Sequence, residues 1–522
     1  MTAIATPIAV EAIPEPPTPA SRPAPTSLQG DVLQSVRNAA KLGLSLLATW
    51  AVALGVRILL PRFLGPATFG AFQFADAFTT AVFVLATLGL ETYVRKEVAT
   101  RREHATEFFG GTLLVTLAMS AVIMVAALAG LAAAHRPPSV LLLVLVLGIA
   151  QILFNANAIT SAMLHAVGAV DGLSVLNVGV KLAWGAGILA ALGTGHGAAG
   201  AAVAVLAAET LRTVALAILA RRHVGLRFLV NRAASGGALR ASLPYYVAGL
   251  AQTVYGRLDL SIMSFLARDV EVGWYGAAST LAGMSLLMSP LIGWVLLPLT
   301  SRAAARSTDE LLVVARRAME IVLAAAFPVT LALWLGADEI VRLAFGAAYV
   351  PAVGALRILA PTFVLTYAAM VNASILIRLE RGWAVTGVSL GGMALSPALN
   401  LWLVPRCLAL YGDGGAGRGA AIALVVTEAY TVVALGWLLG RRALDRRMLG
   451  ALGRTIGVCA AVIAADRLMQ PLGIWRLPID GALYAALAVA AGVVDVRASV
   501  AFVRGMLARR TEQRRQAAEG VA

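Results

Sequence analysis

The sequence predicts an all-α membrane protein with about fourteen transmembrane helices, and three observations support this fold class. The 522 residues are 60% hydrophobic and only 13% charged, with a mean hydropathy of +0.83. Soluble domains are roughly half apolar and about a quarter charged, so a soluble core could not hide all of these side chains. The apolar residues also form runs of about 20, the length of helix that crosses about 30 Å of hydrocarbon. The third observation is an uneven distribution of basic residues.

The apolar runs place fourteen predicted spans along the chain. They cover residues 40–60, 70–92, 109–134, 139–162, 172–193, 198–220, 242–267, 274–299, 315–336, 353–377, 383–404, 418–439, 450–466 and 478–496. All connections between them are short, so the sequence predicts that the protein acts within the membrane.

The basic residues test the topology of these spans. With a cytoplasmic N-terminus, 29 of the 42 Lys and Arg residues fall in cytoplasmic segments, 5 lie within spans and 8 lie outside. Cytoplasmic loops of membrane proteins carry this excess of positive charge. One missed helix would invert every later loop, so the bias predicts an even number of spans with both termini inside. The 8 outer residues are Arg62, Arg136, Arg268, Arg342, Arg406, Arg418, Arg467 and Arg476.

An internal duplication divides the predicted spans. Residues 200–222 and 419–441 match at a constant offset of 219, and Glu209 aligns with Glu428. A weaker match pairs the segment from Phe63 to Gly70 with the segment from Phe265 to Gly273. Six helices separate the copies, so they are parallel repeats. Two such bundles that rock against each other expose a central cleft alternately to each side, as in secondary transporters.

The duplication and the composition predict six segments. A Pro-rich cytoplasmic tail, expected to be disordered, covers residues 1–37. The first six-helix lobe covers 38–222, and a cytoplasmic linker covers 223–241. The second lobe covers 242–442, the last two spans lie within 443–497, and a basic cytoplasmic tail covers 498–522.

Composition and motifs argue against several other functions. The two Cys and five His are scattered, and the sequence has no Walker loop or CxxC motif, so we expect no cofactor and no metal. The net charge of +15 is explained by basic cytoplasmic loops rather than by nucleic-acid binding. A membrane glycosyltransferase, polymerase or ligase usually needs a sizeable outer loop. The outer loops here span only about five to fourteen residues, so we expect no enzyme.

Several ordered motifs over roughly residues 40–440 resemble the polysaccharide flippases of the MOP superfamily. The first runs from Arg62 to Gly70 and the second from Leu243 to Asp259. A third begins at Gly273-Trp-Tyr275 and ends at Leu297-Pro298. Two more run from Phe345 to Leu359 and from Asn400 to Ala423.

The resemblance implies twelve or fourteen helices in two lobes (MOP/MATE-like), with a C-terminal helix pair in the longer form. It implies a transporter in the bacterial inner membrane that moves undecaprenyl-pyrophosphate-linked oligosaccharides outward for cell-surface polysaccharides such as O-antigen. Partners would be the bilayer, the polysaccharide polymerase and export machinery, and a coupling ion, H⁺ or Na⁺. A lipid II flippase or a MATE-like exporter remains the alternative.

Charged residues inside spans are the candidate site. A Lys or Arg at mid-helix costs about 2.5–3.5 kcal/mol on insertion scales, so it should face a cleft or have a partner. The predicted cleft residues are Arg57, Asp76, Lys181, Arg257 and Asp259. Two further arginines have structural interpretations, because Arg212 follows Glu209 by three residues and Arg357 lies near a span end. Asparagines within spans could bind saccharide hydroxyls or join helices; they are Asn155, Asn157, Asn177, Asn372 and Asn400.

Overall fold

The computed structural model describes residues 28–100, 104–167, 170–224, 236–243, 246, 250, 258–284, 300, 301, 303–440 and 446–493. Every regular element in these ranges is a helix, which confirms the predicted all-α class. Residues 1–27 of the predicted tail (1–37), most of the linker and the basic tail at 498–522 lie outside the described residues. Residues 28–37 of the predicted tail belong to a helix.

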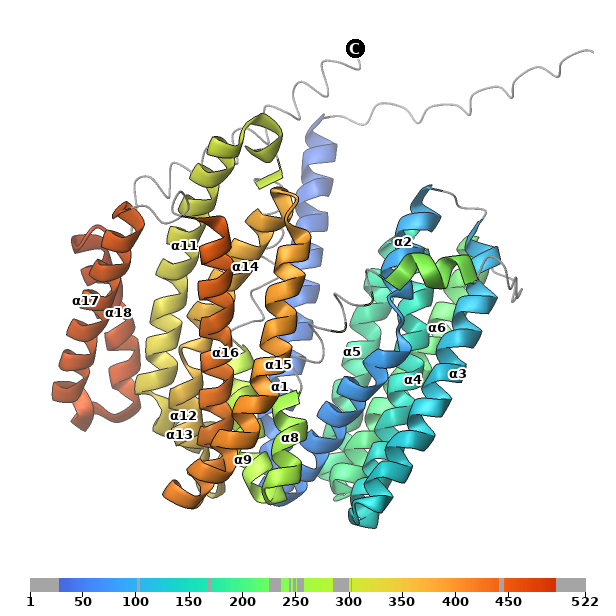
Figure 1. Ribbon diagram of the computed structural model, residues 1–522, viewed down its shortest axis with the longest axis horizontal. Coiled ribbons are helices and arrows are strands. Elements are labelled where there is room, and N and C mark those ends of the chain that lie inside the picture. Colours follow the sequence, from blue (N-terminus) through green and yellow to red (C-terminus); the bar gives the residue numbers. More distant parts are fainter. Residues whose placement is uncertain are drawn as a thin grey trace, which may run out of the picture. The chain divides into compact units, whose positions relative to one another are not determined.

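The chain divides into two compact units, residues 1–51 and 52–522. The described part of the first unit is helical and forms the beginning of α1 (Leu28–Phe83). The second unit contains the rest of α1 and all later helices, which Figure 1 colours from blue to red.

A kink divides α1 into two helical segments. Gly65 has φ 70° and ψ 166°, a backbone conformation that a glycine adopts without strain. Pro61 and Pro66 flank this position, and each lacks the N–H that would continue the helical bonding pattern. The kink falls between predicted spans 40–60 and 70–92, where the sequence placed a short loop.

Five helices follow in the N-terminal half. They are α2 (Leu90–Thr100), α3 (His104–Ala133), α4 (Pro138–Ala166), α5 (Val170–Gly193) and α6 (Gly197–Val224). A 3₁₀ turn (Val84–Ala86) and positive φ angles at Leu88 and Gly89 end α1 earlier than predicted. Gly89 has no room for a side chain, because a Cβ there would lie 2.5 Å from the Tyr246 nitrogen. This contact requires the break between α1 and α2.

The C-terminal half begins with α8 (Leu258–Leu266) and α9 (Asp269–Met284). The helices that follow are α11 (Thr308–Leu335), α12 (Ala337–Phe345), α13 (Ala352–Leu359), α14 (Thr362–Arg378), α15 (Gly382–Tyr411), α16 (Gly415–Leu439), α17 (Arg446–Met469) and α18 (Arg476–Ala490). Short 3₁₀ turns cover Ala347–Tyr349 and Gln470–Trp475. Predicted span 353–377 is therefore two helices, α13 and α14, separated at Pro361.

Ten stretches of the described residues are long and apolar enough to cross a membrane. Two of them, Thr49–Ala86 and Leu452–Ala490, have 38 and 39 residues. At 1.5 Å per residue a straight helix of that length would reach about 57 Å, nearly twice the hydrocarbon thickness. The kink at Gly65 and the turn at Gln470–Trp475 divide each into the two spans that were predicted. Predicted spans 242–267 and 274–299 extend outside the described residues, so the count of fourteen stays a prediction.

The largest hydrophobic core contains residues from both halves of the sequence. Phe74 of α1, Tyr275 of α9 and Leu356 of α13 all belong to it and are at most 1% exposed. A second core lies between α11 and α14, and a third, which includes Leu331 and Tyr484, joins α11 to α17 and α18. Figure 1 shows α17 and α18 side by side, in the colours near the red end of the bar.

Candidate functional site

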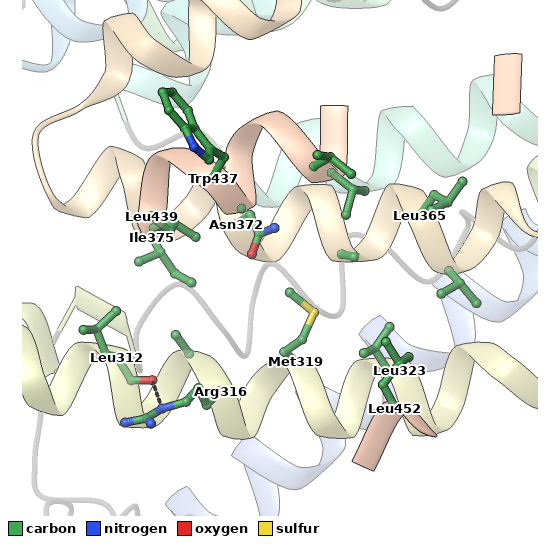
Figure 2. A pocket seen from close by; sticks show the side chains of 16 residues that line it. Leu312, Arg316, Met319, Leu323, Leu365, Asn372, Ile375, Trp437, Leu439 and Leu452 are labelled. Carbon is green, nitrogen blue, oxygen red and sulfur yellow. Dashed lines mark hydrogen bonds between the residues drawn. The ribbon is translucent and has the colours of Figure 1, made fainter. Parts of the chain in front are cut away.

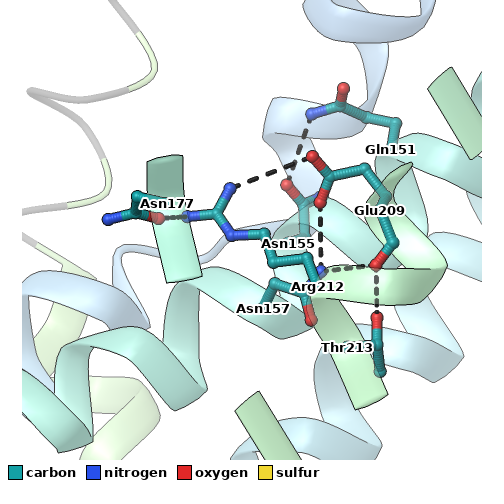
Figure 3. Close-up of polar contacts among 7 residues, drawn as sticks. All are labelled: Gln151, Asn155, Asn157, Asn177, Glu209, Arg212 and Thr213. Atoms are coloured by element: carbon teal, nitrogen blue, oxygen red, sulfur yellow. Dashed lines mark hydrogen bonds and ion pairs between the residues drawn. The ribbon is translucent and has the colours of Figure 1, made fainter. Parts of the chain in front are cut away.

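A polar cluster lies among α4, α5 and α6 of the N-terminal half. The Asn157 side-chain amide on α4 donates to the Glu209 carboxylate of α6 at 3.0 Å. The nearest guanidinium nitrogen of Arg212 lies 3.9 Å from the same carboxylate. Arg212 also donates to the Asn177 side chain of α5 at 3.5 Å, so one glutamate and one arginine connect three helices (Figure 3). This geometry confirms the Glu209–Arg212 pair.

Two predicted cleft residues belong to the same neighbourhood. The Lys181 ammonium of α5 lies 3.7 Å from the centroid of the Trp184 ring, a cation–π contact. Lys181 also interacts electrostatically with Arg57 of α1, which repels it, and with Glu209, which attracts it. With Arg212 included, these four side chains carry three positive charges and one negative charge when all are ionised, a net charge of +2. We call Arg57, Lys181, Glu209 and Arg212 the cationic cluster.

The C-terminal half repeats part of this arrangement. The Thr366 hydroxyl of α14 donates to the Glu428 carboxylate of α16 at 3.2 Å. Glu428 is the residue that the duplication aligns with Glu209, and it is 9% exposed. In each half, therefore, a polar side chain on one helix bonds a glutamate on the helix that carries the repeat. In the N-terminal half α5 also supplies Lys181.

The remaining predicted cleft residues lie elsewhere. Asp259 of α8 is 7% exposed; its carboxylate accepts hydrogen bonds from the Tyr275 hydroxyl and from the Leu260 N–H at 2.8 Å. The Tyr275 bond ties α8 to α9, whereas the Leu260 bond lies within α8. Asp76 is half-buried on α1. Arg257 lies outside the described residues. The structure thus groups Arg57 with Lys181 and gives Asp259 partners of its own.

Several other polar side chains within spans have structural partners. Asn155 donates to the Phe83 carbonyl of α1 at 3.1 Å, and Asn400 donates within its own helix to Ser396. Arg357 pairs with Asp338. For Asn155 and Asn157 the helix-joining interpretation is the one that the contacts support.

An apolar cavity of about 480 Å³ lies among α11, α14, α16 and α17. Its walls include Met319, Ala368 and Trp437 (Figure 2). Two polar side chains interrupt this lining, Asn372 and Arg316, and the Arg316 guanidinium donates to the Leu312 carbonyl at 3.2 Å. Because Arg316 belongs to a predicted cytoplasmic segment, the charged part of the cavity is predicted to lie toward the cytoplasm.

Two glycines bring α1 and α9 into backbone contact. A Cβ added at Gly70 would lie 1.8 Å from the Asp269 carbonyl oxygen, and one added at Gly273 would lie 1.9 Å from the Pro66 carbonyl oxygen. These are the two glycines that the weaker repeat match aligns. We call this contact the glycine crossing. Only glycine permits so close an approach.

Further contacts join the two halves on the side predicted to face outward. The Tyr349 hydroxyl donates to the Pro61 carbonyl at 2.8 Å, and Arg62 donates to the Leu343 carbonyl at 3.1 Å. Arg136 donates to the Ser264 hydroxyl at 2.8 Å. Outer arginines thus join segments that lie more than 100 residues apart in the chain.

A glutamate from α9 accepts a hydrogen bond at the N-terminus of α16. Glu271 is fully buried and accepts from the Gly414 N–H at 2.8 Å. The Ala416 and Gly417 N–H groups face the same carboxyl group, although its second oxygen forms no hydrogen bond of ordinary geometry. Burial raises the pKa of Glu271, and the three N–H groups oppose that rise. The carboxyl group satisfies donors that a helix start leaves open.

The sequence identified the charges of the cationic cluster but not the residues that position them. Asn157 and Asn177 were two of five asparagines with equivalent patterns, and only the packing of α4, α5 and α6 singles them out. The cavity was not predicted as a set of residues either, because its walls come from four helices far apart in the chain.

Comparisons with known proteins agree on the fold. The sequence pattern of the family described as "Polysaccharide biosynthesis protein" matches residues 35–304. No curated protein sequence matches this chain. Lipid II flippase MurJ, in its inward closed conformation, is similar in structure at 11% identity, with a TM-score of 0.68, over 88% of this chain and 100% of that one. An inward-facing multidrug resistance MATE family transporter of the MOP superfamily is similar at 16% identity, with a TM-score of 0.58, over 76% and 96%.

Proposed function

Because this chain belongs to the polysaccharide biosynthesis protein family and has the fold of MOP superfamily transporters, we propose that it flips a lipid-linked saccharide. The substrate class is a polyprenyl-pyrophosphate-linked oligosaccharide, carried from the inner to the outer leaflet by alternating access. The observation that carries this proposal is the cationic cluster, whose residues lie within three predicted membrane spans.

The cationic cluster suits a pyrophosphate. A pyrophosphate cannot enter hydrocarbon without partners, and each close contact with a cation is worth about 4 kcal/mol at an effective dielectric constant near 20. Lys181 and Arg57 repel each other, so an anion between them relieves that repulsion as well as gaining attraction. Asn157 donates to Glu209, which pairs with Arg212, and the net charge of the cluster remains positive.

The apolar cavity suits the polyprenyl tail. It lies against α17, one of the last two predicted spans, and its one basic side chain, Arg316, is on the predicted cytoplasmic side. A tail that slides along this surface stays in an apolar environment while the saccharide crosses.

The glycine crossing suits an outer closure. If the duplicated segments form two lobes, residues 38–222 and 242–442, then the crossing joins equivalent positions of the two. Release toward the outside requires Gly70 and Gly273 to separate. The topology follows the predicted one, with both termini in the cytoplasm of a bacterium and the chain in its inner membrane.

The energy source is the membrane potential, because the sequence has no ATPase motif. An inside-negative potential of 100 mV drives negative charges outward. Two such charges release about 4.6 kcal/mol of free energy as they cross, at about 2.3 kcal/mol per charge. Coupling to H⁺ or Na⁺ through Asp76 or Asp259 would add to this.

The test is outer-leaflet delivery of the lipid-linked saccharide in a deletion strain. The wild-type gene should restore delivery, whereas Lys181→Ala and Arg257→Ala should not. Arg357→Ala is the matched control, because this arginine pairs with Asp338 and is half exposed. Full delivery by both cleft variants would refute the assignment of these residues to the site. Full delivery in the deletion strain itself would refute the proposed function.

The alternative is a lipid II flippase, and the observation that favours it is the fold likeness to MurJ over 88% of this chain. The two functions differ in what accumulates in the inner leaflet of the deletion strain. Accumulation of lipid II would replace the first proposal by the second.

A further inference from the structure

A second buried charge cluster lies where α17, α18 and α12 meet, at the predicted outer end of the last two spans. Arg476, the first residue of α18, is 6% exposed and is surrounded by acceptors. Its guanidinium donates to the Leu335 carbonyl at the end of α11 at 3.0 Å, and to the Glu339 carboxylate of α12 at 2.9 Å. Its Nε lies 3.4 Å from the Asp466 carboxylate of α17.

A third carboxyl group in this cluster has no such partner. Asp480 of α18 is 5% exposed, and both of its carboxyl oxygens are buried without a hydrogen-bond donor in the described part of the chain. Its carboxyl group lies within hydrogen-bonding reach of Asp466 instead. Two carboxyl groups form a hydrogen bond only when one of them holds a proton.

The charge balance leads to the same result. With every group ionised, three carboxylates face one guanidinium, so the cluster would carry a net charge of −2 in a buried place. Two adjacent carboxylates cannot both stay ionised without large cost, and one of them takes up a proton. The described residues contain no group of three or more side chains arranged to hold a metal ion, which favours a proton over a divalent cation.

We propose that Asp466 and Asp480 form a proton-binding site, in which Asp480 carries the proton and donates it to the Asp466 carboxylate. Asp466 stays ionised because Arg476 forms an ion pair with it. Asp480 takes the proton because it has no ion pair of its own among the described residues. The proton comes from the outer aqueous phase, and Glu339, whose side chain is 26% exposed, is the most exposed carboxylate of the cluster.

The ionisable groups around Asp480 lie on three elements. Asp466 is on α17, Arg476 on α18 itself and Glu339 on α12. The α11 helix contributes the Leu335 carbonyl to the cluster. Tyr484 lies one turn further along α18, where its hydroxyl donates to the Ala324 carbonyl at 3.5 Å. Loss of the proton places two negative charges in contact and weakens the attachment of α18 to α17. The attachment of this helix pair is therefore sensitive to pH.

The experiment uses the purified full-length protein in lipid nanodiscs, in buffers free of Na⁺ and divalent cations. Infrared difference spectra between pH values of about 5 and about 8 should contain the carbonyl stretch of a protonated buried carboxyl group, since free aspartate is ionised throughout this range. The band should be absent in Asp480→Asn, whose amide keeps the hydrogen bond to Asp466. It should persist in Asp338→Asn, an exposed matched control.

Thermal unfolding gives an independent readout. The folded wild-type protein holds a proton that the unfolded chain has released, so its stability falls with rising pH until the pair ionises. The Tm difference between Asp480→Asn and wild type should therefore grow with pH by roughly 2 °C per pH unit until that point. If Asp480→Asn fails to fold, the test rests on two infrared measurements. The carboxyl band must be present in the wild-type spectrum and absent from the spectrum of Asp480→Ala.

Three outcomes would overturn the proposal. The first is a wild-type spectrum without the carboxyl band. The second is a band that Asp480→Asn retains. The third is a wild-type Tm that rises with added Na⁺ or Ca²⁺ while remaining unaffected by protons, which would make the cluster a cation site. None of these results depends on whether the protein transports a saccharide.

Discussion

Substitution of Gly70 by alanine is the sharpest perturbation of the proposed transport cycle. The added Cβ would lie 1.8 Å from the Asp269 carbonyl oxygen, whereas real Cβ contacts are essentially never shorter than 3.0 Å. Helices α1 and α9 must therefore separate by at least 1.2 Å, the difference between these distances. The obstacle is backbone, so no side chain can rotate away.

The cost follows from overpacking. Extra atoms in a close-packed contact cost typically 1–3 kcal/mol, and a clash with backbone belongs at about the upper end. If the glycine crossing closes the outer side, the substitution destabilises the closed state by this amount and leaves the open state unchanged. A change of about 3 kcal/mol shifts the balance toward the open state by about 150-fold.

The assay is cysteine accessibility in spheroplasts. In a background without Cys407 and Cys459, Ala77→Cys places a reporter two turns from Gly70, at a position that is 0% exposed. A membrane-impermeant maleimide should label this reporter slowly in the otherwise wild-type protein and much faster with Gly70→Ala. Gly130→Ala on α3 is the control, because nothing lies within 4 Å of its added Cβ.

The reasoning would be refuted by equal labelling rates in Gly70→Ala and Gly130→Ala at equal amounts of folded protein. A faster rate in Gly70→Ala with unchanged thermal stability would support a conformational shift. Slow labelling together with a lower Tm would make the crossing a packing contact with no role as a closure.

Three further substitutions test the remaining parts of the site. Asn157→Ala removes the donor to the half-buried Glu209 carboxylate, which keeps Arg212 as a partner. A hydrogen bond to a charged group is worth about 1.5–3 kcal/mol, so the free energy of unfolding should fall by up to about that amount, measured by thermal unfolding. Glu271→Gln keeps an acceptor for the α16 N-terminus but cannot ionise. Burial raises the folded-state pKa of Glu271, so its stability contribution is complete below the unfolded-chain value of about 4.3 and is lost as the pH rises through the folded-state value. The Tm of the variant should therefore gain on wild type with rising pH, and a gain at falling pH would contradict this sign. Ala368→Trp fills the apolar cavity, so it should slow delivery of the lipid-linked saccharide while the Tm stays near the wild-type value; unaffected delivery would exclude the cavity as the path of the tail.

The sequence alone determined the class of the protein and the order of its helices. Apolar runs and the basic bias are local properties, because the hydrocarbon requires each span to be apolar along its own length. The Gly-Pro segment at Gly65–Pro66 and the turn near Gly473 could be located in the same way, since both depend on the backbone of nearby residues.

Only the tertiary structure decided which charges act together. Lys181 and Arg57 are 124 positions apart in the sequence, and nothing in either segment predicts their interaction. The same is true of Asp466 and Asp480, which lie within the predicted spans 450–466 and 478–496 and which the helix packing buries near Arg476. Asp259 was predicted from its sequence position to line a cleft, and the packing of α8 on α9 gave it Tyr275 as a partner. A charge within a membrane must find a partner, but the partner is chosen by how helices pack, which a pattern of single residues does not encode.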